Sequence, residues 1–313
     1  MEESVLMSSS GKEVSPDVQA LQDSGVNVPL FAVETLDSFD PDPVLGAAKY
    51  RHSLENGTHL DALLVNKRAD VLVVSFHGAT DREKNTLPRF ERLRSFLDYE
   101  VSSMYFTDPA LWLNHKNYFQ LAWFTGWDGF DAQRSAVEWV MKAAKAIGAS
   151  RILFTGASGG GFVALQVSAL VPGSLALAFN PQTSIYGYLA NGHAWGAQKN
   201  YRNVVWPHID APAVGPEMDW TTKLDDRVSA LRRYSKPTAN HVLYATNTLE
   251  FHHEQHYLPF ISAAESGGNI ERVDTFFYEH TTQHTPPGPE HFSAAMKEAL
   301  SLISKLPPTD SLS

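Results

Sequence analysis

Short apolar runs alternate along the chain with longer segments in which apolar residues recur at helical spacing. The runs lie at residues 71–76, 103–106, 152–155, 175–179, 241–246 and 273–278. Most of them are rich in β-branched and aromatic residues, as expected for strands that are buried on both faces of a parallel sheet. The chain therefore predicts a sheet built largely from its central and C-terminal parts.

Helical periodicity fills the intervals between these runs. Residues 132–147 carry an apolar stripe between Asp131, a residue type that caps helix N-termini, and Gly148, a typical helix stop. Residues 159–170 and the segment that begins at Pro289 are also predicted helices, and residues 88–97 show the same spacing. The order of strands and helices predicts a doubly wound α/β fold, with a mostly parallel central sheet and helices on both faces.

The N-terminal part follows a different pattern. Apolar runs at 30–33 and 60–65 flank Asn56-Gly57, a strong hairpin signal, and predict edge strands and an antiparallel start of the sheet. Residues 1–28 are polar and serine-rich and predict a loosely ordered leader, and 308–313 form a tail. We therefore predict a single domain over residues 29–307.

Residues 184–238 interrupt the alternation of strands and helices. They are rich in tyrosine and tryptophan, with glycine, asparagine and proline between them. An ordered insertion of this length between two strands is usually functional, so we interpret it as a cap or lid over the active site. The alternative is a surface insertion without a functional role.

Composition narrows the class of protein. The chain has 313 residues, 43% of them hydrophobic, which is enough for one large α/β domain. The net charge of −10 without a basic block excludes the electrostatic footprint of a nucleic-acid binder. The absence of cysteine excludes disulfides, thiolate catalysis and cysteine-type zinc sites. No secretory signal and no apolar stretch of ~20 residues is visible, so we expect a cytoplasmic protein without a membrane span.

The candidate chemistry centres on Gly156-Ala157-Ser158-Gly159-Gly160, which stands between a predicted strand and a predicted helix. In a nucleophile elbow the serine adopts a strained backbone conformation, and glycines two residues away remove collisions with neighbouring backbone. We therefore predict Ser158 as a nucleophile. The alternative is a glycine-rich turn that holds a phosphate, but the Lys-Ser/Thr of a P-loop and a clean dinucleotide fingerprint are missing.

A second loop, His77-Gly78-Ala79-Thr80, follows the strand at 71–76. Active sites of open α/β sheets lie at the carboxyl ends of the strands, so the loop is placed to offer backbone N–H groups of Gly78 and Ala79 to an oxyanion. The alternative is an ordinary turn in which His77 is a hydrogen-bonded neighbour.

A serine hydroxyl needs a histidine to accept its proton and a carboxylate to orient that histidine. In chain order the loops after the last two strands offer Glu250 and then His284. His280 and His291 are rival bases, and Glu254 and Asp225 are weaker candidates for the acid. We favour His284 because Pro286-Pro287 stiffen the loop that carries it.

His252 and His256 raise the alternative of a metal site, because their i, i+4 spacing on a helix would let them share one ion. The spacing His253-Glu254-Gln255-His256 is one residue short of the His-Glu-x-x-His motif, and no third ligand is evident. We therefore expect no metal and no cofactor, and interpret these histidines as hydrogen-bonding residues at a helix start.

Taken together, four motifs resemble the α/β-hydrolase superfamily over roughly residues 60–305. They are the elbow, Asn180-Pro181-Gln182-Thr183, Asn247-Thr248-Leu249-Glu250-Phe251-His252-His253 and His284-Thr285-Pro286-Pro287. More narrowly, they look like the bacterial branch associated with capsule biosynthesis and with the acyltransferase-like component of accessory secretion systems. In that branch an aspartate is commoner where Glu250 stands, and a glycine often stands where Leu249 does.

The resemblance implies Ser158 as nucleophile, His284 as base, Glu250 as acid, and an oxyanion hole from Gly159 with the Gly78/Ala79 loop. It predicts a serine hydrolase that cleaves a carboxylic ester, such as an acyl ester of a sugar, and it also permits acyl transfer to a glycan hydroxyl. A non-catalytic binding or scaffold protein is the alternative of another class. The expected partner is a small-molecule or glycan ester, and the sequence leaves the oligomeric state open. We expect substrate contacts from His77, Trp127, Gln182 and Tyr186.

Overall fold

The computed structural model describes residues 6–7, 13–14, 28–43, 46–190, 193–194, 196–209 and 219–309. Of the predicted leader at 1–28, the described residues are Val28 and two short strands, β1 (Leu6–Met7) and β2 (Glu13–Val14). Residues 310–313 of the predicted tail also lie outside the described residues.

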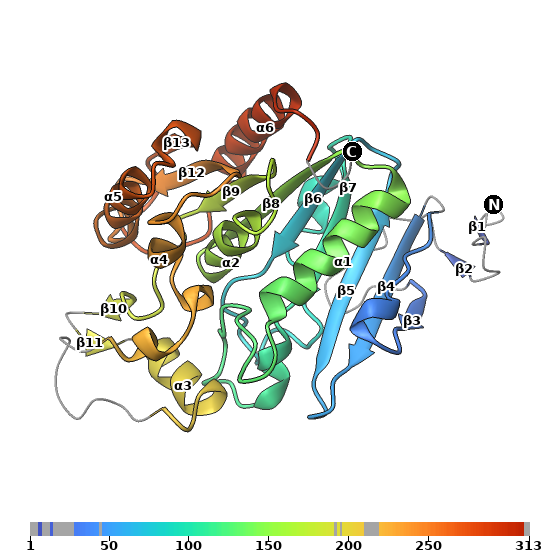
Figure 1. Ribbon diagram of the computed structural model, residues 1–313, viewed down its shortest axis with the longest axis horizontal. Coiled ribbons are helices and arrows are strands. Elements are labelled where there is room, and N and C mark those ends of the chain that lie inside the picture. The colour runs from blue at the N-terminus through green and yellow to red at the C-terminus, as the bar shows by residue number, and fades with distance from the viewer. Residues whose placement is uncertain are drawn as a thin grey trace.

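A nine-stranded sheet runs through the described part of the chain, in the order β13-β12-β9-β8-β6-β7-β5-β4-β3 (Figure 1). The six strands from β13 to β7 are parallel, β5 pairs antiparallel with both β7 and β4, and β3 lies parallel to β4. The predicted mostly parallel α/β sheet is confirmed. The strands are β3 (Leu30–Ala32), β4 (Gly46–Ser53), β5 (His59–Asn66), β6 (Val71–Phe76), β7 (Ser102–Thr107), β8 (Arg151–Ala157), β9 (Leu175–Phe179), β12 (His241–Asn247) and β13 (Val273–Tyr278).

The predicted hairpin joins β4 to β5. Gly57 has φ +79°, a conformation that glycine adopts without strain, and its N–H donates to the carbonyl of Leu54. The turn thereby sets the antiparallel register in which Ser53 lies opposite His59. The predicted hairpin and its antiparallel pair are confirmed, but the run at 30–33 forms β3, which pairs parallel with β4, and β4 itself was not predicted.

Helices cover both faces of the sheet, and α1 and α2 lie across one of them in Figure 1. Leu72, Val74 and Phe76 of β6 face the same core cluster as these helices, whereas Val73 faces the cluster that contains α6. This alternation is why the strands are apolar without interruption. The helices are α1 (Ala132–Ile147), α2 (Gly159–Ser168), α3 (Gly196–Val205), α4 (Ala230–Tyr234), α5 (Leu258–Ser266) and α6 (Pro289–Lys305).

Short helical turns join these elements. They are the 3₁₀ turns η2 (Leu36–Ser38), η3 (Arg94–Phe96), η4 (Pro109–Leu113), η5 (Trp220–Lys223), η6 (Asp226–Val228) and η8 (Ile270–Arg272), and the π-helical turn η7 (His253–Tyr257). As predicted, Asp131 caps α1 and Gly148 ends it in the left-handed conformation, with φ +74°.

The predicted helix at 88–97 is wrong: only the 3₁₀ turn η3 forms there. Phe90, Leu93 and Phe96 are buried as their spacing indicated, but Arg92 has φ +70°, which a right-handed helix does not tolerate. The ammonium of Lys67 donates to the carbonyls of residues 96, 97 and 99 at 3.3, 2.8 and 3.1 Å. A distant side chain thus binds the carbonyls at the end of this segment, which a helix over 88–97 would itself have left without an intrahelical partner.

The aromatic insertion at 184–238 contains the short strands β10 (Leu189–Ala190) and β11 (His193–Ala194), together with α3, η5, η6 and α4. A β-bridge between Ser184 and Ser229 closes its two ends. Its Tyr201 hydroxyl lies 2.8 Å from Thr125 Oγ1, so the insertion packs on the aromatic segment that precedes α1. Residues 191–192, 195 and 210–218 lie outside the described residues, and the role of a lid stays a prediction.

In the part of the chain that the structure describes, no helix has both the length and the apolar character needed to cross a bilayer.

Candidate active site

Ser158 stands at the sharp turn between β8 and α2, with φ +55° and ψ −118°. A Cβ on Gly156 would lie 2.4 Å from the carbonyl carbon of Gly160, and a Cβ on Gly160 would lie 2.2 Å from the carbonyl oxygen of Phe76. Both contacts are far below van der Waals distance and involve backbone atoms. The glycines therefore let the strained serine turn lie directly against β6.

The hydroxyl of Ser158 lies 2.8 Å from Nε2 of His284, 126 residues away along the chain. The other ring nitrogen of His284, Nδ1, lies 3.2 and 3.3 Å from the two carboxylate oxygens of Glu250. The Glu250 side chain is fully buried, and that of His284 is 21% exposed. Nδ1 therefore carries a proton that it donates to Glu250, and Nε2 is free to accept the proton of Ser158.

Two asparagines at strand ends hold the loops of Glu250 and His284 together. Asn247 Oδ1 accepts from the N–H groups of Leu249 and His280, both at 3.2 Å, and its amide donates to the carbonyl of Thr281 at 2.7 Å. Asn180 Oδ1 in turn accepts from the N–H of Asn247 at 2.7 Å. Both asparagines belong to motifs quoted from the sequence, but their role in joining the two loops was not predicted.

Among the described residues, the rival candidates for the acid and the base make no hydrogen bond to Ser158. Glu254 is exposed, and Asp225 is the N-cap of η6 and pairs with Arg227 at 3.1 Å. The rings of His280 and His291 pack against each other with centroids 5.5 Å apart. Among the described residues, the Ser158 hydroxyl has hydrogen bonds only to His284 and Gln182.

His252 and His256 lie buried beside the predicted base. The ring of His252 packs against that of His284 at 3.9 Å between centroids, and its Nδ1 donates to the carbonyl of Asn180 at 2.8 Å. His256 Nδ1 accepts from the N–H of Thr183 at 3.2 Å. Burial lowers the pKa of His256 to about 3 and that of His252 well below its usual value, so both rings are neutral at pH 7.

One group of side chains has the spacing of a metal site. Ligand atoms of Glu250, His252 and His284 lie within 4.8 Å of one another. The same Glu250 and His284 atoms form the predicted acid–base pair, so binding of a metal there would displace that pair. His256, which the i, i+4 alternative paired with His252, does not belong to the group.

The predicted oxyanion loop lies against the elbow. A Cβ on Gly78 would be 3.8 Å from Ser158 Cβ and 3.9 Å from the nitrogen of Gly159. The N–H of Gly78 already donates to Glu91 Oε2 at 3.2 Å, whereas those of Ala79 and Gly159 have no acceptor among the described residues. Of these two predicted donors, Ala79 lines the cavity that opens at Ser158, whereas Gly159 is buried and does not line it.

His77 lies behind this loop and is buried. Its Nε2 accepts from the N–H of Asp108 at 3.0 Å, which leaves the proton on Nδ1, and Nδ1 donates to the carbonyl of Gly78 at 2.7 Å. Burial lowers the pKa of His77 to about 4, so the ring stays neutral. The ring nitrogens are both used inside the protein, and the structure gives His77 the geometry of a loop anchor.

A cavity of about 250 Å³ opens at Ser158 and His284. Gly78, Ala79 and Asn180 line it, together with Arg89 and Glu91, which sequence reasoning missed because they belong to the segment predicted as a helix. The Arg89 guanidinium lies 3.8 Å from the Glu91 carboxylate, so the wall carries one charge of each sign. No described residue of 184–238 lines this cavity.

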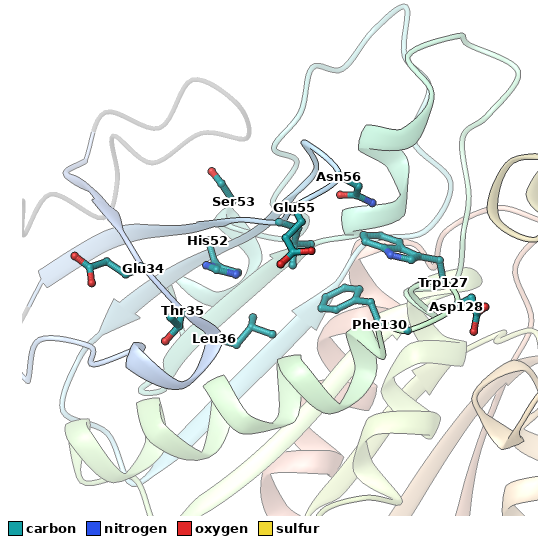
Figure 2. Close-up of a pocket in the computed structure, with 12 residues that line it drawn as sticks. Glu34, Thr35, Leu36, His52, Ser53, Glu55, Asn56, Trp127, Asp128 and Phe130 are labelled. Carbon is teal, nitrogen blue, oxygen red and sulfur yellow. The ribbon is translucent and has the colours of Figure 1, made fainter.

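Two of the predicted substrate contacts lie away from it. Trp127 lines a separate cavity of about 740 Å³ with Phe130 and the hairpin around Glu55 (Figure 2), and the two rings are 4.7 Å apart. Tyr186 is half-buried, and its carbonyl accepts from the amide of Gln198 at 2.9 Å. Gln182 is fully buried, and its amide nitrogen donates to Ser158 Oγ at 2.8 Å. The structure thus brings only Gln182 of these three to the serine.

Known protein structures give the fold an independent comparison. No protein-family model and no curated protein sequence matches the chain. Among solved structures, acylaminoacyl peptidase from Pyrococcus horikoshii is similar with a TM-score of 0.54 and 13% identity, over 83% of this chain and 41% of the peptidase. The chain thus spans about two fifths of that protein's length.

For two other similar structures, the match covers most of the length of their own chains. Carboxyl esterase 2 from the fungus Tuber melanosporum has a TM-score of 0.54 and 14% identity, over 83% of this chain and 87% of the esterase. The capsule O-acetyltransferase of Neisseria meningitidis serogroup A has a TM-score of 0.55 and 9% identity, over 80% of this chain and 95% of that enzyme. With its six parallel strands, helices on both faces and serine turn after β8, this chain has the α/β-hydrolase fold.

Proposed function

We propose that the chain is a serine hydrolase that cleaves a carboxylic ester through an acyl-enzyme intermediate. The observation that carries the proposal is the hydrogen-bonded series from Ser158 Oγ to His284 Nε2, at 2.8 Å, and from His284 Nδ1 to the buried carboxylate of Glu250. A hydroxyl, an imidazole and a carboxylate in this order have the geometry of an activated nucleophile. Similar structures that are esterases add support.

In the first step Ser158 Oγ bonds to the carbonyl carbon of the ester while its proton passes to His284 Nε2. The electron pair of the carbonyl bond moves to the carbonyl oxygen, which we expect the N–H groups of Ala79 and Gly159 to stabilise. As the pair returns, the alcohol leaves with the proton from His284, and an acyl-serine remains. Water then attacks the acyl-serine with His284 as base, and the carboxylic acid and free Ser158 are released.

Loss of one oxyanion donor typically costs about 3 kcal/mol of transition-state stabilisation. The position of the loop at residues 77–80 therefore matters as much as the serine–histidine contact. Glu250 contributes by holding the tautomer of His284 and by stabilising the imidazolium that forms in each half-reaction.

Acyl transfer to a sugar hydroxyl is a second candidate, favoured by the likeness to a capsule O-acetyltransferase over 95% of that chain. The first half-reaction is unchanged. In the second, a sugar hydroxyl takes the place of water, gives its proton to His284 and leaves as the sugar ester. The two functions differ only in whether water or the sugar reaches the acyl-serine first.

Fluorophosphonate labelling tests the proposal. The wild-type protein should incorporate one phosphonyl group per chain, and Ser158→Ala should incorporate none while unfolding at the same urea concentration. A wild-type protein that remains unlabelled would contradict the enzymatic function and favour a binding or scaffold protein.

Acetate release from p-nitrophenyl acetate, with and without added monosaccharides, then separates hydrolysis from transfer, because transfer yields an acetylated sugar in place of acetate.

A further inference from the structure

The nucleophile has a second hydrogen-bond partner, which lies outside its predicted triad. Gln182, three residues after β9, is fully buried, and its Nε2 lies 2.8 Å from Ser158 Oγ. This distance equals the one from Oγ to His284 Nε2. Gln182 does not line the cavity at Ser158, so its contact with the serine is made from inside the protein.

Trp123 fixes which end of the Gln182 amide faces the serine. Its indole Nε1 lies 3.1 Å from Gln182 Oε1, and an indole nitrogen can only donate. Oε1 is therefore the acceptor in that contact, and the amide nitrogen must point to Ser158. Trp123 is itself buried and held edge-on by Tyr201, with centroids 5.2 Å apart.

The orientation of the amide decides where the serine proton goes. Since Gln182 donates to Oγ, the hydroxyl must donate its own proton elsewhere, and His284 Nε2 is its acceptor. A reversed amide would present a carbonyl oxygen to Oγ and compete with His284 for that proton. The pairing with Trp123 excludes this reversed state.

We infer that Gln182 is a further catalytic residue that directs the serine proton to His284 and stabilises negative charge on Oγ, and that Trp123 is its positioning residue. Charge develops on Oγ twice. It does so when His284 takes the hydroxyl proton during attack, and again when Oγ leaves the acyl carbon with its bonding electron pair and regains a proton from His284. An N–H at hydrogen-bond distance stabilises both states.

This inference rests on the proposed function, because it requires Ser158 to react. The test compares Gln182→Met, which keeps the length of the side chain without the N–H, with Trp123→Phe, which removes the indole donor. Gln133→Met and Trp139→Phe are matched controls. Both residues are fully buried on α1, and they bond the carbonyls of Arg227 and Leu36 rather than the active site.

The rate constant of fluorophosphonate labelling should fall about 10- to 100-fold in Gln182→Met, as expected for loss of a hydrogen bond to a charged group, and about 10-fold in Trp123→Phe. The double variant should be no slower than Gln182→Met, because Trp123 acts through Gln182. The controls should stay within about twofold of wild type. With p-nitrophenyl acetate, Gln182→Met should lower kcat and leave KM unchanged, because the residue lies outside the cavity.

Labelling of Gln182→Met at the wild-type rate would overturn the inference and leave the proposed function intact. Additive losses in the double variant, or a raised KM with unchanged kcat, would also overturn it, since they indicate a packing or substrate-binding role. If Gln182→Met does not fold, as judged by urea unfolding, Trp123→Phe decides alone, and a wild-type rate in that variant overturns the inference. A wild-type protein that does not label contradicts the proposed function itself.

Discussion

Glu250 is a fully buried carboxylate whose two oxygens both face one nitrogen of His284. The role of acid therefore depends on one pair of side chains, with contacts of 3.2 and 3.3 Å, and not on a broad network of charges. His252, whose ring packs tilted against that of His284, lies 3.7 Å from the same carboxylate but donates its Nδ1 proton to the carbonyl of Asn180. The Glu250 carboxylate therefore accepts its hydrogen bond from His284 and not from His252.

Glu250→Gln should slow ester hydrolysis and fluorophosphonate labelling by about 10³- to 10⁴-fold, because an amide neither fixes the tautomer of His284 nor stabilises its imidazolium. Glu254→Gln is the matched control, since Glu254 is exposed on the same segment, and its rates should stay within about twofold of wild type. Pre-steady-state labelling measures both variants. A Glu250→Gln variant with more than a tenth of wild-type activity would show that another group serves as the acid.

At the scale of elements, the elbow depends on close approach of β8, α2 and β6. Gly160→Ala should destabilise the fold by about 3 kcal/mol, because its Cβ would lie 2.2 Å from the backbone carbonyl oxygen of Phe76 and neither backbone can move independently. Gly196→Ala is the control, since a Cβ there meets nothing within 4 Å, and its free energy of unfolding should change by less than about 0.5 kcal/mol. Urea denaturation measures both. Equal stability of the two variants would mean that β6 does not lie against the elbow.

The segment that replaces the predicted helix at 88–97 depends on Lys67. Lys67→Met should lower the free energy of unfolding by about 2 kcal/mol, because three carbonyls lose a charged donor. Lys84→Met is the comparison, since Lys84 is exposed and its ammonium lies 3.2 Å from the carboxylate of Asp81, and its effect should stay below about 0.5 kcal/mol. Urea midpoints at pH 7.5 check the difference. No loss in Lys67→Met would mean that local propensity, not Lys67, holds this segment.

At the scale of the whole molecule, buried histidines couple stability to pH. Burial lowers the pKa of His77 to about 4 and of His256 to about 3, and that of His252 well below 6.5, so each ring takes up a proton on unfolding below pH 6.5. Burial raises the pKa of Asp108 to about 6 in the folded protein. Between pH 6 and 4 this carboxyl therefore releases its proton when the protein unfolds. The unfolded chain therefore binds about two more protons, and stability falls as pH falls from 6.5.

The free energy of unfolding should accordingly decrease by about 1.4 kcal/mol per pH unit for each net proton taken up. Urea midpoints at pH 7.5 and 5.0 measure this change, and the lower pH should give the lower midpoint. His256→Asn should reduce the pH dependence by about one proton. A midpoint that is equal or higher at pH 5.0 would contradict the neutral state of these histidines in the folded protein.

The sequence by itself determined the six parallel strands and the helices α1, α2 and α6, although it did not predict β4 and wrongly predicted a helix at 88–97. Continuous apolar runs such as 71–76 and the stripe of α1 are local patterns, and burial on one or two faces follows from them without knowledge of the partner. Gly156 is equally local, because a Cβ there would meet Gly160 four residues on, whereas Gly160 responds to the distant carbonyl of Phe76. The fold class could therefore be predicted from periodicity and from the position of the elbow.

Tertiary structure alone decided which side chains meet. Asn247 joins the loop of Glu250 to that of His284, and this contact decides whether Glu250 or Glu254 faces His284. Trp123 holds the amide of Gln182, and this contact decides whether Gln182 faces the serine or a substrate. The same holds for 88–97, where Arg92 has φ +70° and Lys67 binds the carbonyls at the end of the segment, and for Trp127, which lies at another cavity. Hydrogen bonds act over about 3 Å and depend on direction, so residue type and spacing cannot specify them until the strands have set the relative positions of their loops.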